Sequence, residues 1–166
     1  EWLKTQSRSM GQNMNFVGGK YILTQQDEPY AAFAQICRRI CVDIGDFDDS
    51  ATATTCGSSL TSHSSFTEEA RTIAKELQKR LGTQSKILCR VVPNLRLLLG
   101  NEGVSSSDDT ATTIRLDERH QLHMAFRIFF QVLSEVKLQV LVLDDLQWAD
   151  QASIDLLRYL VSDREN

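Results

Sequence analysis

The feature that most restricts the fold of this chain is a short apolar run, Val140-Leu141-Val142-Leu143, followed at once by Asp144-Asp145. Four apolar residues are too few for a helix, and such a run is typical of a strand buried on both faces of a parallel sheet. Residues 115–136 before it, and the residues after Asp150, carry apolar side chains at helical spacing. Helix, buried strand, acidic turn and helix predict an α/β fold in which helices flank parallel strands.

The first hundred residues predict further elements of the same kind. Residues 15–21 predict a strand that runs into a Gly-rich turn, and Pro29 is expected at the first position of a helix. Ser65-Phe66-Thr67-Glu68 has the form of a capping box and predicts the start of another helix. A short helical piece over 87–92 is ended by Pro93.

Length and composition predict one globular domain, because 166 residues with 42% hydrophobic and 24% charged side chains can bury a core. Two Ser/Thr-rich stretches, 46–65 and 101–113, lack large apolar residues and are expected to be flexible loops. The chain opens on Glu1 without Met and stops soon after a helical pattern. We therefore interpret residues 1–166 as part of a domain in a longer protein.

Charge and hydropathy exclude two classes of partner. The net charge is −4, and a dedicated nucleic-acid binder usually carries a basic excess. No apolar run approaches the length of about 20 residues that a membrane-spanning helix needs. The four cysteines form no C-x-x-C pair, and reduced thiols predict a cytoplasmic chain. A zinc site built from Cys37, Cys41, His120 and His123 is an alternative, although these spacings fit no standard zinc finger.

The acidic pair is the strongest candidate for chemistry. Ligands of open parallel sheets bind at the carboxyl ends of the strands, where one carboxylate can hold Mg²⁺ and a second can orient an attacking water. The run with Asp144 and Asp145 has this Walker B form. A solvated turn with a helix-capping aspartate would give the same two residues, so the pair alone leaves both interpretations open.

The surrounding residues resemble one family. Asp144-Asp145-Leu146-Gln147-Trp148-Ala149-Asp150, followed by Ala152-Ser153-Ile154-Asp155-Leu156-Leu157, is similar to the "DDLQWAD…SLdLL" signature of STAND-type, AAA-like signal-transduction ATPases. Residues 16–21 with 27–33 resemble that family's "fvsGKfd…ePYsaf" block, and residues 92–100 resemble its "iPeL…iiG" block. The three blocks occur in the family's order and cover nearly the whole chain.

The resemblance implies a partial P-loop NTPase fold, AAA-like and three-layered with helices flanking the parallel strands, that binds ATP with Mg²⁺. Asp144 matches the family's magnesium-side acid, and Asp145 matches the position of the acid that orients the attacking water. The roles of Gln147, Trp148 and Asp150 are not assigned; Trp148 is expected to pack within its loop, and Asp150 to cap the following helix or to serve as a polar sensor.

Gly18-Gly19-Lys20 is not the phosphate loop, because the pattern G-x-x-x-x-G-K-[ST] would need Gly at 14 and Ser or Thr at 21. The sequence has Met14 and Tyr21 there. In the family this Gly-Lys follows the second strand, so the phosphate loop is expected upstream of this chain.

The first hypothesis is an ATP-hydrolysing regulatory switch in a larger signalling protein, of the kinase-associated kind, with fused or partner signalling domains. An alternative is a non-catalytic protein-interaction module that retains the NTPase fold. A DNA-binding, initiator-like ATPase is a third, which the charge of −4 disfavours. Oligomeric state stays open.

Overall fold

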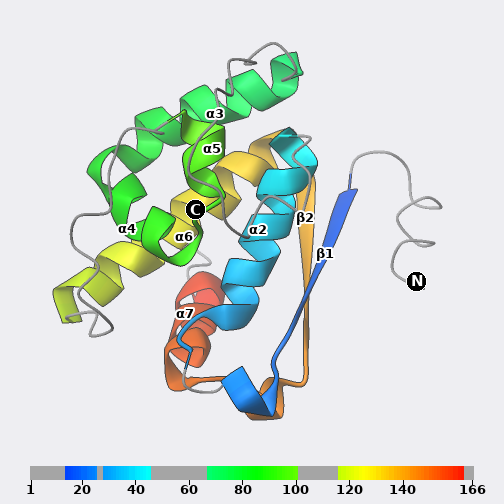
Figure 1. The fold of residues 1–166 in the computed structure, drawn as a ribbon, viewed down its shortest axis with the longest axis vertical. Coiled ribbons are helices and arrows are strands. Elements are labelled where there is room, and N and C mark those ends of the chain that lie inside the picture. The colour runs from blue at the N-terminus through cyan, green and yellow to red at the C-terminus, as the bar shows by residue number, and fades with distance from the viewer. Residues whose placement is uncertain (1–13, 26–27, 46–66, 101–115, 163–166) are drawn as a thin grey trace, which may run out of the picture.

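The computed structural model describes residues 14–25, 28–45, 67–100 and 116–162 (Figure 1). In chain order the elements are β1 (Met14–Lys20), the short 3-10 turn η1 (Leu23–Gln25), α2 (Ala31–Gly45), α3 (Glu68–Leu81), η3 (Gly82–Gln84), α4 (Ser85–Val91), α5 (Leu95–Leu99), α6 (Leu116–Val136), β2 (Leu138–Asp144), η4 (Leu146–Trp148) and α7 (Gln151–Ser162). The loops expected over 46–65 and 101–113 fall outside the described residues.

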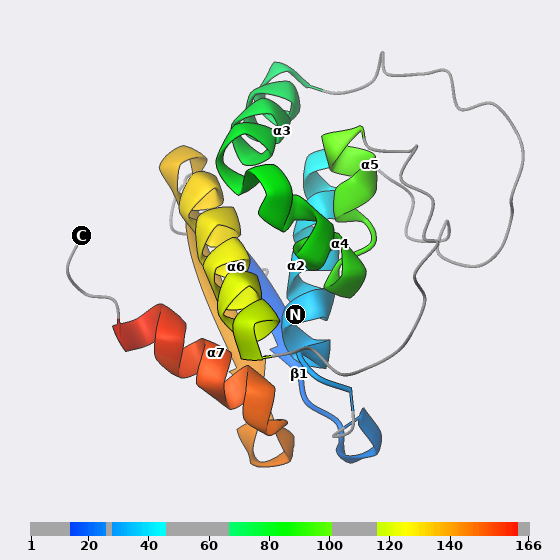
Figure 2. The same ribbon diagram turned by 90° about the vertical axis from the view of Figure 1, so that its left-hand side faces the viewer.

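The two strands pair in parallel, with Phe16 opposite Val140 and Lys20 opposite Asp144. Parallel neighbours need a crossover connection, and the intervening helices provide it. In both Figures 1 and 2 the described helices lie on one face of this sheet. The prediction of an α/β fold with parallel strands and packed helices is confirmed.

The sheet is less buried than the apolar run predicted. Leu141 and Leu143 pack against the core from one face, beside the buried Val17. Side chains alternate along a strand, so Val140 and Val142 point to the opposite face, where they stay only half-buried. The prediction of burial on both faces was wrong for the described part of the chain, because its helices cover one face alone.

Helix α2 begins later than Pro29 predicted. The helix starts at Ala31, and the residue before it, Tyr30, adopts a left-handed backbone with φ of 65°. A non-glycine residue in this region costs conformational energy that surrounding contacts must offset. Tyr30 is 1% exposed, packs against Phe126, and its hydroxyl lies 3.2 Å from Nε2 of His123. These contacts with α6 fix the turn, so Pro29 lies outside the helix.

Helix α3 is capped by a different residue from the one expected. Thr67 is the N-cap, and its hydroxyl accepts a hydrogen bond of 3.2 Å from the amide of Ala70. Ser65, the expected cap, lies outside the described residues. The C-cap is Gly82, whose φ of 48° suits a residue without Cβ.

The long helix α6 matches its prediction and forms the centre of the core. Its completely buried side chains recur at three- and four-residue spacing and are Leu122, Ala125, Phe126 and Phe129. Helices α3 and α4 pack against it, and the ring of Phe33 in α2 lies 6.0 Å from that of Phe126. Among the described helices, none combines the length and apolarity that crossing a membrane requires.

Three cysteines lie in this core as free thiols: Cys37, Cys41 and Cys89. Burial, with a smaller effect of the Cys89 thiol, raises the pKa of Cys41 to about 12. Burial likewise raises the pKa of Cys37 well above its ordinary value. Because the thiolate is the reactive form, packed thiols of this kind are chemically inert.

We therefore expect native protein at pH 8 to leave Cys37 and Cys41 unlabelled by iodoacetamide, and unfolded protein to label both rapidly. Mass spectrometry of peptides locates each adduct, and Cys56, outside the described residues, is scored separately. Fast native labelling of Cys41 would contradict its packed, protonated state.

Candidate functional site

The candidate site lies where the two strands end. The register puts Lys20, the last residue of β1, opposite Asp144, the last residue of β2. The amide of Tyr21 still donates to the carbonyl oxygen of Asp144, at 3.1 Å, which keeps the two chains together one residue further. The structure therefore brings a basic side chain from residue 20 to an acidic pair more than a hundred residues away in sequence.

Lys20 contacts both acids. Its Nζ lies 3.0 Å from Oδ2 of Asp145 and 3.8 Å from Oδ2 of Asp144. The hydrogen bond to Asp145 is the main reason why the pKa of Lys20 is raised, and the same bond is the main reason why the pKa of Asp145 is lowered. Lys20 and Asp145 are therefore both charged at neutral pH.

The backbone at Asp145 is in the left-handed region, with φ of 55° and ψ of 43°. Aspartate tolerates this conformation better than most residues because its short side chain bonds locally. The amide of Asp145 donates to Oδ1 of Asp144 at 2.9 Å. The amide of Trp148 donates to the carbonyl oxygen of Asp145 at 2.9 Å, which closes η4. The acidic pair therefore sits in a defined turn.

Gly19 serves packing between β1 and α2. A Cβ at Gly19 would come within 2.8 Å of the carbonyl oxygen of Ala32 and 2.9 Å of Cδ1 of Ile36. Gly18, Gly19 and Lys20 all belong to the strand β1, where they pair with β2. Their arrangement is that of a strand end, in agreement with the expectation that this Gly-Lys is not a phosphate loop.

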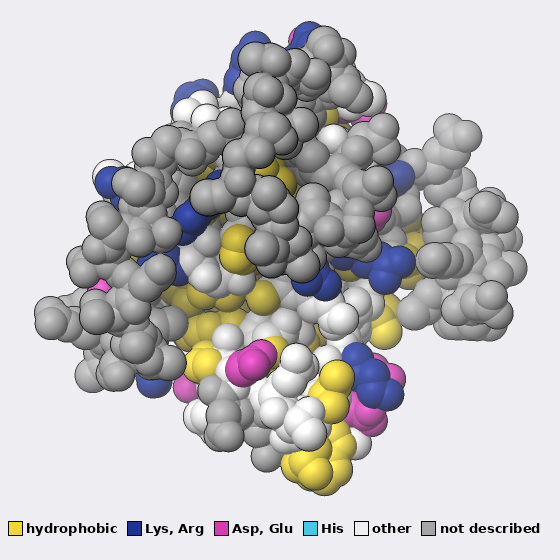
Figure 3. All heavy atoms as spheres, viewed as in Figure 1, with side chains coloured by type: hydrophobic (Ala, Val, Ile, Leu, Met, Phe, Trp, Pro, Cys, Tyr) yellow, Lys and Arg dark blue, Asp and Glu magenta, His cyan; other side chains and the backbone are white. Residues whose placement is uncertain are grey.

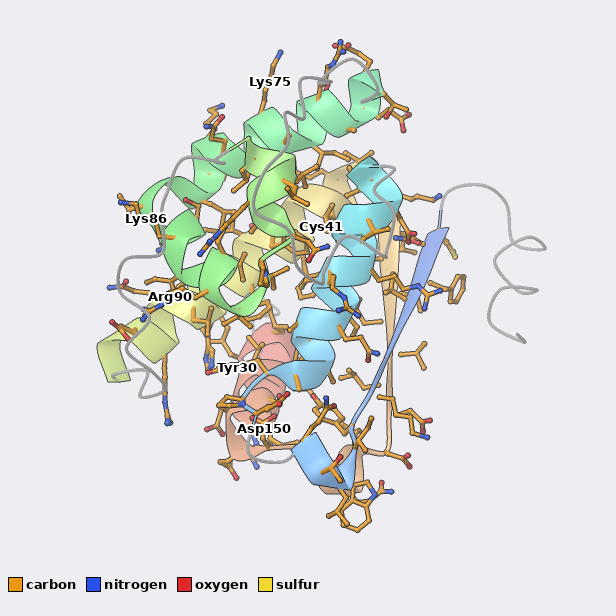
Figure 4. All side chains as sticks on the ribbon, viewed as in Figure 1. Tyr30, Cys41, Lys75, Lys86, Arg90 and Asp150 are labelled. Atoms are coloured by element: carbon orange, nitrogen blue, oxygen red, sulfur yellow. The ribbon has the colours of Figure 1, made fainter. Side chains whose placement is uncertain are left out.

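Asp150 is the N-cap of α7. Its Oδ1 accepts from the amide of Ser153 at 2.8 Å, and its Oδ2 accepts from the Ser153 hydroxyl at 2.5 Å. The expectation of a helix cap is confirmed. Figure 4 shows Asp150 at the same end of the molecule as Tyr30, below the middle of α2.

Trp148 does not pack as expected. It is 37% exposed, and the turn η4 that carries it lies beyond the end of the sheet. Apolar side chains lie open at this lower end of the molecule (Figure 3), where η1 and η4 lie in Figure 1. The exposed apolar residues in and beside these two turns are Ile22, Leu23, Leu146 and Trp148.

The alternative zinc site receives no support from the described residues. No group of three His, Cys, Asp or Glu side chains within them could hold a metal ion. Cys37 and Cys41 lie in the core, whereas His123 contacts Tyr30 and Tyr159. The histidines belong to the helix packing between α6 and α7.

The comparisons with known proteins give one family. The model of the AAA ATPase domain matches residues 2–166, almost the whole chain. The chain belongs to this family. No curated protein matches the chain, and no solved structure matches it. In this AAA ATPase domain, the parallel strands β1 and β2 end at Lys20 and Asp144.

Members of this family generally use ATP and Mg²⁺. The donor set here suits a hard cation, since Mg²⁺ prefers carboxylate oxygens and water. Asp144 is suited to bind such a cation because its side chain is 67% exposed. Its Oδ2 lies 3.8 Å from Nζ of Lys20, a loose ion pair. Sequence reasoning missed Lys20 as a partner of these acids. Both strands were predicted, but the register that puts Lys20 opposite Asp144 was not predicted.

Proposed function

We propose that this AAA domain hydrolyses ATP, with Asp144 as the magnesium ligand and Asp145 as the acid that orients the attacking water. The observation that supports this most is the pair of adjacent carboxylates at the carboxyl end of β2, in the family's ATP-binding fold. Ligands of such sheets bind at this end of the strands.

The two acids would have different roles, because their contacts differ. The Asp144 side chain is mostly exposed and can bind the ion that neutralises phosphate charge. Asp145, its pKa lowered chiefly by the Lys20 hydrogen bond, stays ionised and can accept a hydrogen bond from water. The amide of Asp145 donates a hydrogen bond to Oδ1 of Asp144, and this bond holds the Asp144 carboxylate in one orientation.

Phosphate binding needs further groups. The pattern G-x-x-x-x-G-K-[ST] does not occur in the 166 residues, and Lys20 is engaged with Asp145. Two carboxylates without amide and lysine donors repel a nucleotide. We propose that residues 1–166 form the Walker B part of a domain whose phosphate loop is supplied by other residues.

Calorimetry tests this proposal. Titrating Mg-ATP into the 166-residue protein should give no binding at micromolar concentrations, whereas the intact protein with a phosphate loop should bind and hydrolyse ATP. Micromolar binding by the 166-residue protein would mean that the phosphate site lies within it, and would overturn the interpretation of Gly19 and Lys20.

The biological role that we propose is a regulatory switch of the STAND type, in which hydrolysis resets the conformation of a signalling protein with fused or partner domains. The support is the sequence similarity around Asp144-Asp145-Leu146-Gln147-Trp148-Ala149-Asp150. The competing proposal, a non-catalytic interaction module, predicts that the intact protein binds its partners unchanged after Asp145→Asn and shows no ATP turnover. Turnover of the intact wild type, together with partner binding before and after Asp145→Asn, separates the two.

A further inference from the structure

The side chain of Gln147 gives Asp145 a second fixed contact. Its Nε2 donates to Oδ1 of Asp145 at 3.0 Å, while Lys20 binds the other oxygen, Oδ2, at 3.0 Å. Each oxygen of this carboxylate therefore has its own partner, on a different element. A rotation of the carboxylate would break both contacts.

The turn η4 holds Gln147 in place. The amide of Trp148 donates to the backbone carbonyl oxygen of Asp145 at 2.9 Å, and the amide of Ala149 donates to the carbonyl oxygen of Leu146 at 3.1 Å. Asp150 then joins the turn to α7 through its two bonds to Ser153. The Gln147 backbone is thus fixed on both sides, two residues after the acid that its side chain binds.

Gln147 and Lys20 differ in what they do to the carboxylate. The amide is neutral, so it orients Asp145 without cancelling its charge, whereas the ammonium pairs with that charge. An acid that orients water must keep one oxygen with available negative charge. Oδ2 is paired with the Lys20 ammonium, whereas Oδ1 accepts from a neutral donor and keeps negative charge available for a water.

We propose that Gln147 is the positioning residue of Asp145, holding Oδ1 in the orientation in which this oxygen can also accept a hydrogen bond from the attacking water. This inference rests on the proposed ATP hydrolysis and assigns a function to a residue whose role the sequence left open. Gln147 acts through Asp145 and needs no contact with the nucleotide.

The test compares Gln147→Ala with Gln151→Ala. Gln151 donates to Oδ1 of Asp155 at 2.8 Å, so the control removes a bond of the same kind away from the acidic pair. In the intact protein, Gln147→Ala should lower kcat roughly tenfold, as loss of supporting contacts around a site commonly does, with KM for Mg-ATP changed less than about twofold. Gln151→Ala should leave both constants unchanged. Gln147→Glu, similar in shape but without the donor, should lower kcat at least as much.

A second measurement needs no activity. Three-bond NMR couplings report χ1 of Asp145, which should occupy one rotamer in the wild type and average over several in Gln147→Ala, with an unchanged melting temperature. A single rotamer in Gln147→Ala, or kcat equal to that of Gln151→Ala, would overturn the inference. If the intact wild type shows no ATP turnover, the proposed function fails, and the couplings alone then decide whether Gln147 positions Asp145.

Discussion

Gly19→Ala should destabilise the protein by roughly 2 kcal/mol, the range measured when a methyl group is forced into a packed interior. The added Cβ would lie 2.8 Å from the carbonyl oxygen of Ala32, a backbone atom that moves only if α2 moves. The same Cβ would lie 2.9 Å from Cδ1 of Ile36. The gain in strand propensity over glycine, about 0.5–1 kcal/mol, is too small to offset this.

Gly18→Ala is the matched control on the same strand. Among the described residues its Cβ would meet only the carbonyl oxygen of Val142, at an ordinary 3.9 Å, on the face that the described helices leave uncovered. This variant should be neutral or slightly more stable. Urea unfolding of both variants, with equal m-values, measures the difference; equal stability of the two would mean that β1 and α2 are not packed as described.

Asp145→Asn should slow ATP hydrolysis by the intact protein about a hundredfold or more, because removing a group that handles the attacking water commonly has effects of this size. Nucleotide binding should change little. Asp144→Asn should instead weaken Mg²⁺-dependent binding of ATP roughly tenfold or more, because a magnesium ligand loses its charge. Turnover at varied Mg²⁺ concentration, together with calorimetry, separates the two effects.

Asp155→Asn is the control, since it removes an aspartate of α7 that contacts Gln151 and Arg158 away from the strand ends. Its kinetic constants should equal those of the wild type. The folding stability of Asp145→Asn should fall little, because solvent-exposed ion pairs contribute little to stability. Equal, small effects of Asp144→Asn and Asp145→Asn on turnover, with binding untouched, would refute the Walker B assignment.

Local chemistry in the sequence was enough to predict most elements. The apolar run before Asp144 predicted β2, the spacing of apolar residues over 115–136 predicted α6, and Asp150 was correctly expected to cap a helix. These features depend on neighbours within a few residues, where side-chain periodicity and capping act directly. The family resemblance likewise depended on contiguous residues, and the AAA ATPase match bears out its coarser part.

Predictions that depended on distant contacts were less successful. Pro29 indicated a helix start, yet Tyr30 takes a left-handed backbone because its ring packs on Phe126 of α6. Trp148 was expected to pack, but the turn that carries it projects past the sheet. No local pattern describes how far a turn extends from the core.

The sequence by itself therefore determined that this chain has parallel strands, packed helices and an acidic pair at a strand end, because side-chain spacing and strand length are properties of adjacent residues. Only the tertiary structure decided that Lys20 lies beside Asp145, that Gly19 must remain without a side chain, and that the described helices cover one face of the sheet. Each of these depends on strand register and helix approach, which are fixed when segments far apart in the chain pack together.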